Sequence, residues 1–110
     1  MQAKLLLDPA AYETIKALIE QWMPGVDVWA YGSRVKGLAH DLSDLDLVIR
    51  NRQNLEQPTP HLASLKQKFQ ESDLPILVDV MDWAYLPETY REEIQQTYVP
   101  FMVYTERRAQ

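Results

Sequence analysis

The sequence contains no cysteine. This absence excludes disulfide bonds, cysteine-based zinc sites and a thiol nucleophile. Long hydrophobic runs are also absent, because no stretch approaches the roughly 20 apolar residues that span a membrane. The three leucines before Asp8 are too few for the core of a signal peptide. We therefore expect a soluble, cytoplasmic protein that does not contact a membrane.

Positive charge is scarce. The chain has 11 Lys and Arg against 16 Asp and Glu, which gives a formal net charge of -5. Binding to a phosphate backbone requires a basic face, so we expect no direct binding to nucleic acid. A chain of 110 residues can bury one core and has no room for a second lobe. We expect a single domain that spans residues 1–110.

Helical and extended patterns alternate along the chain, which predicts a sheet with helices packed on it. Asp8 and Pro9 have the residue types of a helix N-cap and first position, and Pro24-Gly25 ends that helix. Further helices are predicted at 33–36, where Ser33 is the expected cap, around 62–69 and at 87–97. Strands are predicted at 26–31, 45–49, 76–81 (buried) and 99–104 (at an edge), with a loop at 50–60.

Two carboxylates stand at the start of an apolar strand. Asp44 and Asp46 alternate with Leu45, Leu47 and Ile49. Side chains alternate across a strand, so the aspartates share one face and the apolar residues fill the core from the other. Two like charges roughly 7 Å apart repel each other. A hard divalent cation such as Mg²⁺ would remove that repulsion.

A third carboxylate, Asp79, interrupts the apolar run 76–81. An ionised aspartate in a buried strand is costly unless a partner compensates its charge. If this strand neighbours the one that carries Asp44 and Asp46, the three carboxylates converge. Three carboxylates can hold two metal ions for an in-line phosphoryl displacement. An ion pair with Arg34 is the alternative explanation for Asp79.

A Gly-Ser turn lies between the first two predicted strands. Gly32 lacks a Cβ atom and allows a close approach of the backbone. Ser33 begins a short helix, whose N-terminus suits a phosphate group. Arg34 and Lys36 add positive charge beside it. For the turn to meet the aspartates, the first two strands must pair in antiparallel fashion.

Competing motifs do not fit. The segment GSRVKG has the outer spacing of a P-loop, but Leu38 follows where a lysine is required. A calcium-binding loop fails because Val48 occupies the position of the third ligand. His40 and His61 are isolated and are expected to be surface residues.

The order of these residues resembles a known signature. Gly32-Ser33, ten residues, then Asp44-x-Asp46, with Asp79 on a later strand, is similar to the G-S-x10-D-x-D pattern of the polymerase-β-like nucleotidyltransferases. Over most of the chain the sequence resembles the minimal nucleotidyltransferase (MNT) family. The resemblance implies a single-domain α/β (α+β) core with a mixed sheet of about four strands.

The resemblance also assigns roles to residues. It implies that the three aspartates are catalytic and bind two Mg²⁺ ions, with Asp79 helping to deprotonate the incoming hydroxyl group. It implies that Gly32 and Ser33 hold the β- and γ-phosphates of ATP, the substrate. The expected catalytic and metal-binding residues are Asp44, Asp46 and Asp79, and the expected nucleotide-binding residues are Gly32, Ser33, Arg34, Lys36 and Ser43.

The resemblance further implies a protein partner. Members of this family are commonly encoded beside a HEPN ribonuclease toxin, and some neutralise it by transferring AMP to a tyrosine. The alternatives are an antitoxin that acts by contact alone and a nucleotidyltransferase for a small molecule or an RNA end. Exposed aromatic residues of the last third would form the surface for the toxin or for self-association, among Trp83, Tyr85, Tyr90, Tyr98, Phe101 and Tyr104.

Overall fold

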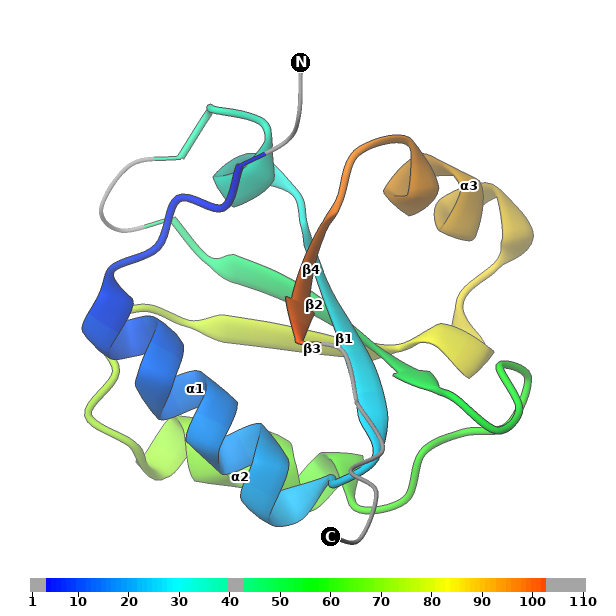
Figure 1. Cartoon of the computed structure of the whole chain (residues 1–110), viewed down its shortest axis with the longest axis horizontal. Coiled ribbons are helices and arrows are strands. Elements are labelled where there is room, and N and C mark those ends of the chain that lie inside the picture. The colour runs from blue at the N-terminus through cyan, green and yellow to red at the C-terminus, as the bar shows by residue number, and fades with distance from the viewer. Residues whose placement is uncertain (1–3, 40–42, 103–110) are drawn as a thin grey trace, which may run out of the picture.

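The computed structural model describes residues 4–39 and 43–102. A mixed four-stranded sheet with the strand order β3-β2-β1-β4 forms its centre (Figure 1). This confirms the predicted mixed sheet of four strands with helices packed on it. The strands are β1 (Val26–Tyr31), β2 (Leu45–Asn51), β3 (Val78–Asp82) and β4 (Val99–Met102); the helices are α1 (Pro9–Trp22), α2 (Leu62–Glu71) and α3 (Glu88–Gln96), with short 3-10 helices η1 (Ser33–Val35) and η2 (Trp83–Tyr85).

Helix α1 begins as the sequence predicts. The Asp8 carboxylate accepts hydrogen bonds from the backbone amides of Ala10 (3.1 Å) and Ala11 (3.2 Å). These bonds satisfy two of the amides that the first helical turn leaves without a partner. Ile15 and Ile19 lie on one face of α1 and are fully buried. The cap and the apolar face together fix where α1 starts and how it packs.

Among the described residues, no helix has the length and apolar character that crossing a membrane requires.

Strand β2 lies between an antiparallel and a parallel neighbour. It pairs antiparallel with β1, which confirms the predicted pairing, and parallel with β3. Strand β4 pairs antiparallel with the other side of β1 and is an edge strand, as predicted. The starts of β2 and β3 therefore lie beside the end of β1.

Two hydrophobic cores cover the two faces of the sheet. The larger core lies on the side of α1 and α2 and includes Leu45, Leu47 and Ile49, all fully buried, as the strand alternation predicts. Figure 1 shows α3 on the other side of the sheet. There Val48 is also fully buried, in a smaller core with Ile94 of α3. The sequence predicts a solvent-facing side for β2, but most of that side is covered.

Aromatic residues build the smaller core around one arginine. The Trp29 ring stacks on Tyr98, with centroids 3.9 Å apart, and meets Trp83 edge to face at 5.5 Å. The Arg50 guanidinium lies 3.8 Å from the centroid of the Trp29 ring. Burial lowers the pKa of Arg50, but an attractive interaction with Asp27, its register partner on β1, opposes that effect. Cation–π contact thus helps to hold this half-buried charge against the smaller core.

The other aromatic residues of the last third divide between core and surface. Phe101 is buried, whereas Tyr85 is 74% exposed and Tyr90 is 41% exposed. Tyr104 lies outside the described residues. Two tyrosines therefore remain accessible, on η2 and on α3.

Three predicted elements are corrected. Strand β3 spans Val78–Asp82, so the strand predicted at 76–81 is confirmed over 78–81 but begins two residues later. It is an edge strand and only partly buried, and Leu77 before it is 70% exposed. The predicted helix at 33–36 is a three-residue 3-10 helix with Gly32, rather than Ser33, at its N-cap. Strand β2 continues to Asn51, into the predicted loop. Residues 103–104 of the last predicted strand lie outside the described residues.

Asp82, at the end of β3, is a buried aspartate that the sequence analysis did not single out. One of its oxygens accepts hydrogen bonds from the Thr59 amide (2.8 Å) and hydroxyl (2.9 Å), and the other accepts from the Ala84 amide (3.1 Å). It is 4% exposed. Asp82 thus joins the loop before α2 and the start of η2 to the sheet.

We expect Asp82→Ala to lower the free energy of unfolding by about 2–3 kcal/mol, because it leaves buried donors at Thr59 and Ala84 without an acceptor. Urea denaturation of both proteins measures this difference. The matched control is Asp73→Ala, since Asp73 is an exposed aspartate, and its effect should stay within about 0.5 kcal/mol. Equal effects of the two substitutions would contradict the structural role of Asp82.

Candidate active site

The residues of the candidate site meet where β1 ends and β2 and β3 begin. Asp46 is the direct register partner of Tyr31 on β1 and of Asp79 on β3. Gly32 follows Tyr31 and begins the Gly-Ser turn. The antiparallel β1–β2 pair therefore brings the turn to the aspartates, as predicted, and the parallel β2–β3 pair brings the third carboxylate beside the second.

Gly32 packs directly against Asp46. Its backbone has φ 81° and ψ -156°, a conformation that only glycine adopts without strain. A Cβ atom at this position would overlap the Asp46 Oδ2 atom. Gly32 thus lies against the carboxylate of β2, and its predicted close approach to a phosphate stays a prediction.

The three aspartates form a cluster of like charges. Asp46 is half-buried, and Asp44 and Asp79 are exposed. Burial raises the pKa of Asp46, and the neighbouring charges of Asp79 and Asp44 raise it further. A divalent cation would relieve this repulsion, and carboxylate oxygens are the ligands that Mg²⁺ prefers. Within residues 4–39 and 43–102, however, no three Asp, Glu or His side chains converge closely enough to form a ready-made metal site.

A cleft opens between this cluster and α3. It has a volume of about 190 Å³. Helix α3 lines it with positions i, i+3, i+4 and i+7, which share one helical face. The lining includes the cation Lys36, and its predicted contact with a phosphate stays a prediction. The lining residues are Tyr31, Gly32, Lys36, Asp46, Tyr90, Glu93, Ile94 and Thr97.

Tyr31 connects the carboxylates to α3. It is 8% exposed, and its ring meets the Tyr90 ring edge to face, with centroids 6.4 Å apart. Burial raises the pKa of Tyr31 strongly; a side-chain hydrogen bond to Tyr90 and the charges of Tyr90, Asp46 and Asp79 act in the same direction. Tyr31 is therefore a neutral phenol at physiological pH. It supplies a polar group between Asp46 and Tyr90 without adding charge.

The structure gives Arg34 a different environment from the predicted phosphate contact. Arg34 is 7% exposed. Its Nε atom donates to the Ser43 carbonyl oxygen (3.0 Å), and a terminal nitrogen donates to the Leu6 carbonyl oxygen (2.7 Å). Arg34 thus holds the N-terminal segment and the start of β2 against η1. Asp79 is exposed, and no ion pair joins it to Arg34 within the described residues.

The remaining predicted residues are placed as follows. Ser33 and Ser43 are half-buried on either side of the loop between β1 and β2, and their contacts with a nucleotide stay predictions. His61 is exposed at the start of α2, as predicted, and His40 lies outside the described residues. The helix predicted at 87–97 is confirmed as α3, but the sequence analysis did not predict that it lines the cleft. The spacing of Tyr90, Glu93, Ile94 and Thr97 is a signal that could have identified this face.

Gly32→Ala should destabilise the protein and displace the Asp46 carboxylate. We expect backbone strain to lower the free energy of unfolding by about 1–3 kcal/mol, and the overlap with Asp46 to lower it further. Gly37→Ala is the matched control, because Gly37 also has a positive φ (75°) but nothing lies within 4 Å of the position that its Cβ atom would take. Chemical denaturation compares the two variants. If Gly37→Ala destabilises the protein as much as Gly32→Ala does, the overlap with Asp46 does not contribute to the loss of stability.

Asp46→Asn should stabilise the protein at neutral pH by a few tenths to about 1 kcal/mol, because it removes a charge opposite Asp79. The raised pKa means that the folded protein keeps this proton to a higher pH than the unfolded chain does. The stability of the parent therefore falls as the pH rises from about 3.9, the ordinary pKa of aspartate, through the raised folded-state pKa. Asp46→Asn should lack this fall. Melting temperatures of both proteins across this pH range test the prediction. A lower melting temperature for Asp46→Asn than for the parent at neutral pH would contradict it.

Comparison with known proteins agrees with this arrangement. Residues 12–109 match the family described as "Nucleotidyltransferase domain". The chain is 48% identical over 87 residues to the "Probable protein adenylyltransferase MntA" of Haemophilus influenzae, covering 77% of this chain and 73% of that protein. The fold is similar to a structure described as "Crystal structure of the toxin-antitoxin with AMP-PNP", with TM-score 0.66, 20% identity, and coverage of 83% of this chain and 72% of the other. The chain therefore belongs to the nucleotidyltransferases, in the minimal nucleotidyltransferase family.

Proposed function

We propose that this protein is an Mg²⁺-dependent antitoxin that transfers AMP from ATP to a hydroxyl group of a HEPN ribonuclease toxin, the acceptor being a tyrosine. The observation that carries the proposal is the register that sets Asp46 between Tyr31 and Asp79, beside Gly32. This register places a glycine turn and three carboxylates at one end of the sheet. Such a combination suits the alignment of a triphosphate for in-line displacement.

The three aspartates are the proposed metal ligands. Asp44, Asp46 and Asp79 would hold two Mg²⁺ ions, whose binding supplies charge neutralisation and alignment of the phosphates. The raised pKa of Asp46 means that its ionised form is disfavoured beside the other two carboxylates. Side-chain rotation would bring the exposed Asp44 and Asp79 toward shared ions. Asp79 is also the proposed acceptor of the proton from the incoming hydroxyl group.

The turn and the cleft are the proposed phosphate end of the site. Gly32 and Ser33 would contact the β- and γ-phosphates, and Lys36, which lines the cleft, would offset the charge of the leaving pyrophosphate. Arg34 is left out of this set, because its guanidinium binds the Ser43 and Leu6 carbonyl oxygens.

The position of Asp79 on the edge strand β3 supports a protein as the acceptor substrate. Strand β3 is an edge strand, so Asp79 lies at an open side of the sheet that a large partner can approach. A partner protein that docks there brings its own hydroxyl group into position, and the domain then needs no additional lobe to grip a substrate. The relative named as a protein adenylyltransferase and the toxin–antitoxin structure support the same choice.

Incubation with a cognate HEPN toxin, Mg²⁺ and α-labelled ATP should transfer label to the toxin. Asp46→Asn should reduce the rate at least about 100-fold, as expected when a metal ligand worth about 3 kcal/mol is lost. Asp73→Asn, which removes an exposed carboxylate outside the site, is the matched control and should transfer label at the parental rate.

The alternatives give different outcomes in the same assay. An antitoxin that acts by contact alone would leave the partner unlabelled and would still block its ribonuclease activity when Asp46 is replaced. A nucleotidyltransferase for RNA or a small molecule would place label on that molecule without the partner. Either result would overturn the proposal.

A further inference from the structure

Tyr90 presents a phenol at the cleft of the proposed active site. It lies on the face of α3 that lines the cleft together with Gly32 and Asp46. Its ring meets the Tyr31 ring edge to face, with centroids 6.4 Å apart, and Tyr31 is the register partner of Asp46. A single side chain therefore links Tyr90 to the central carboxylate of the site. At 41% exposure, Tyr90 is also accessible to a molecule bound there.

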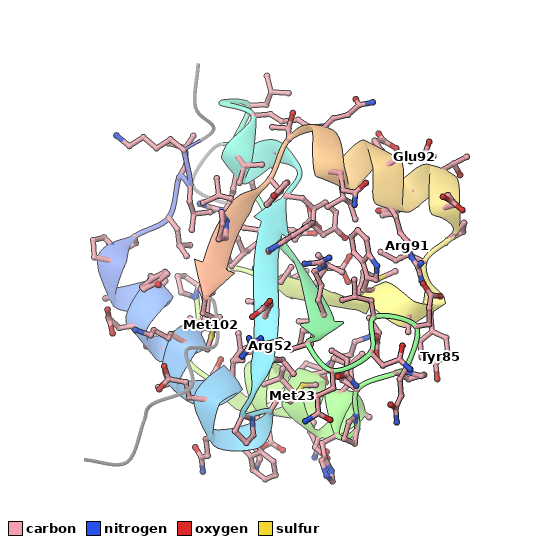
Figure 2. All side chains as sticks on the ribbon, turned by 45° about the vertical axis from the view of Figure 1, so that its right-hand side comes forward. Met23, Arg52, Tyr85, Arg91, Glu92 and Met102 are labelled. Carbon is pink, nitrogen blue, oxygen red and sulfur yellow. The ribbon has the colours of Figure 1, made fainter. Side chains whose placement is uncertain are left out.

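The other described tyrosines lack this combination. The Tyr12 hydroxyl donates to the Phe101 carbonyl oxygen (3.0 Å), and Tyr98 stacks on Trp29. Tyr85 is more exposed than Tyr90 but belongs to η2, which follows the far end of β3 from Asp79. Figure 2 shows Tyr85 at the outer side of the molecule. Within the described residues, Tyr90 is thus the accessible phenol of the cleft.

The size of the cleft determines what Tyr90 would meet. Its volume of about 190 Å³ is below the roughly 300–1,000 Å³ of pockets that enclose a whole small-molecule ligand. The cleft therefore accommodates part of a nucleotide, whose phosphates would lie beside Gly32 and Lys36, with a divalent cation between them and Asp46. A triphosphate bound at this end of the sheet brings its phosphorus atoms toward the Tyr90 side chain.

We propose that Tyr90 is an internal acceptor, so that the protein transfers an adenylyl group from ATP to its own Tyr90 hydroxyl when no partner hydroxyl occupies the site. This inference rests on the proposed nucleotidyltransferase function and names a second substrate for the same site. Because Tyr90 lies in the cleft of its own chain, the transfer is intramolecular.

The reaction is a simple substitution at phosphorus. The Tyr90 oxygen forms a bond to the α-phosphorus of ATP, and the bond between that phosphorus and the bridging oxygen of pyrophosphate breaks. The bonding electron pair leaves with pyrophosphate, and the phenolic proton passes to a neighbouring carboxylate and then to solvent. The product is a tyrosine phosphodiester that carries AMP. It fills the cleft, so a modified molecule has less room for a further nucleotide.

Mass spectrometry of the protein incubated with Mg²⁺ and ATP, without a partner, tests the inference. We expect a mass increase of one adenylyl group, mapped by peptide fragmentation to Tyr90. The fraction modified at a given time should not change when the protein is diluted tenfold, as an intramolecular step requires. Mapping on the parental sequence keeps the test independent of whether any variant folds.

Two variants sharpen the assignment. Tyr90→Phe should lose the modification, with its fold checked by circular dichroism, and Tyr85→Phe is the matched control that should retain it. Loss of the adenylyl group in Asp46→Asn would connect the modification to the same site. A modification that maps elsewhere, or that persists in Tyr90→Phe, would overturn the inference.

Parallel incubation with the partner separates this inference from the proposed function. Label on the partner with none on the antitoxin alone would overturn the inference and leave the proposed function intact. Label on Tyr90 with none on the partner would support the inference and count against the toxin as substrate. No label on either protein, in a sample that binds Mg²⁺-ATP, would overturn both.

Discussion

The register of three neighbouring strands is the constraint on which the site depends. Tyr31, Asp46 and Asp79 lie side by side because β2 pairs antiparallel with β1 and parallel with β3. A slip of one residue in β2 would turn Asp46 into the core and expose its apolar neighbours. The fully buried side chains of β2 prevent that slip. The positions of the carboxylates are thus fixed by hydrophobic burial on the same strand.

Both faces of β2 contribute to this constraint, although unequally. On the face of α1 and α2, Leu45, Leu47 and Ile49 enter the larger core. On the other face, Val48 is buried under η2 and α3, while Asp46, two residues earlier, is only half-buried. Asp46 therefore stands where the covered part of the sheet meets the open end. There its charge experiences both burial and two neighbouring carboxylates, which explains the direction of its pKa shift.

Local signals predict most of the elements, and tertiary context explains the errors. The Asp8 cap, the Pro24-Gly25 stop and the alternation around Asp46 each depend on neighbours in the sequence, so they are predictable. The apolar run at 76–81 has the composition of a buried strand, and sequence alone does not reveal that no strand among the described residues pairs with the outer side of β3. The carbonyl contacts of Arg34 could not be predicted for a similar reason, because its partners at Leu6 and Ser43 come from other parts of the chain.

The distribution of charge determines how such a site can bind a nucleotide. Three carboxylates stand at the end of the sheet, and Arg34 is engaged by backbone carbonyl oxygens. Lys36 is the one cation among the described residues that line the cleft. With a formal net charge of -5, the protein as a whole also repels polyphosphate. A triphosphate therefore gains little attraction from the side chains themselves. Divalent cations held by the aspartates would have to supply it, which makes the register of Asp46 and Asp79 a condition for substrate binding as well as for catalysis.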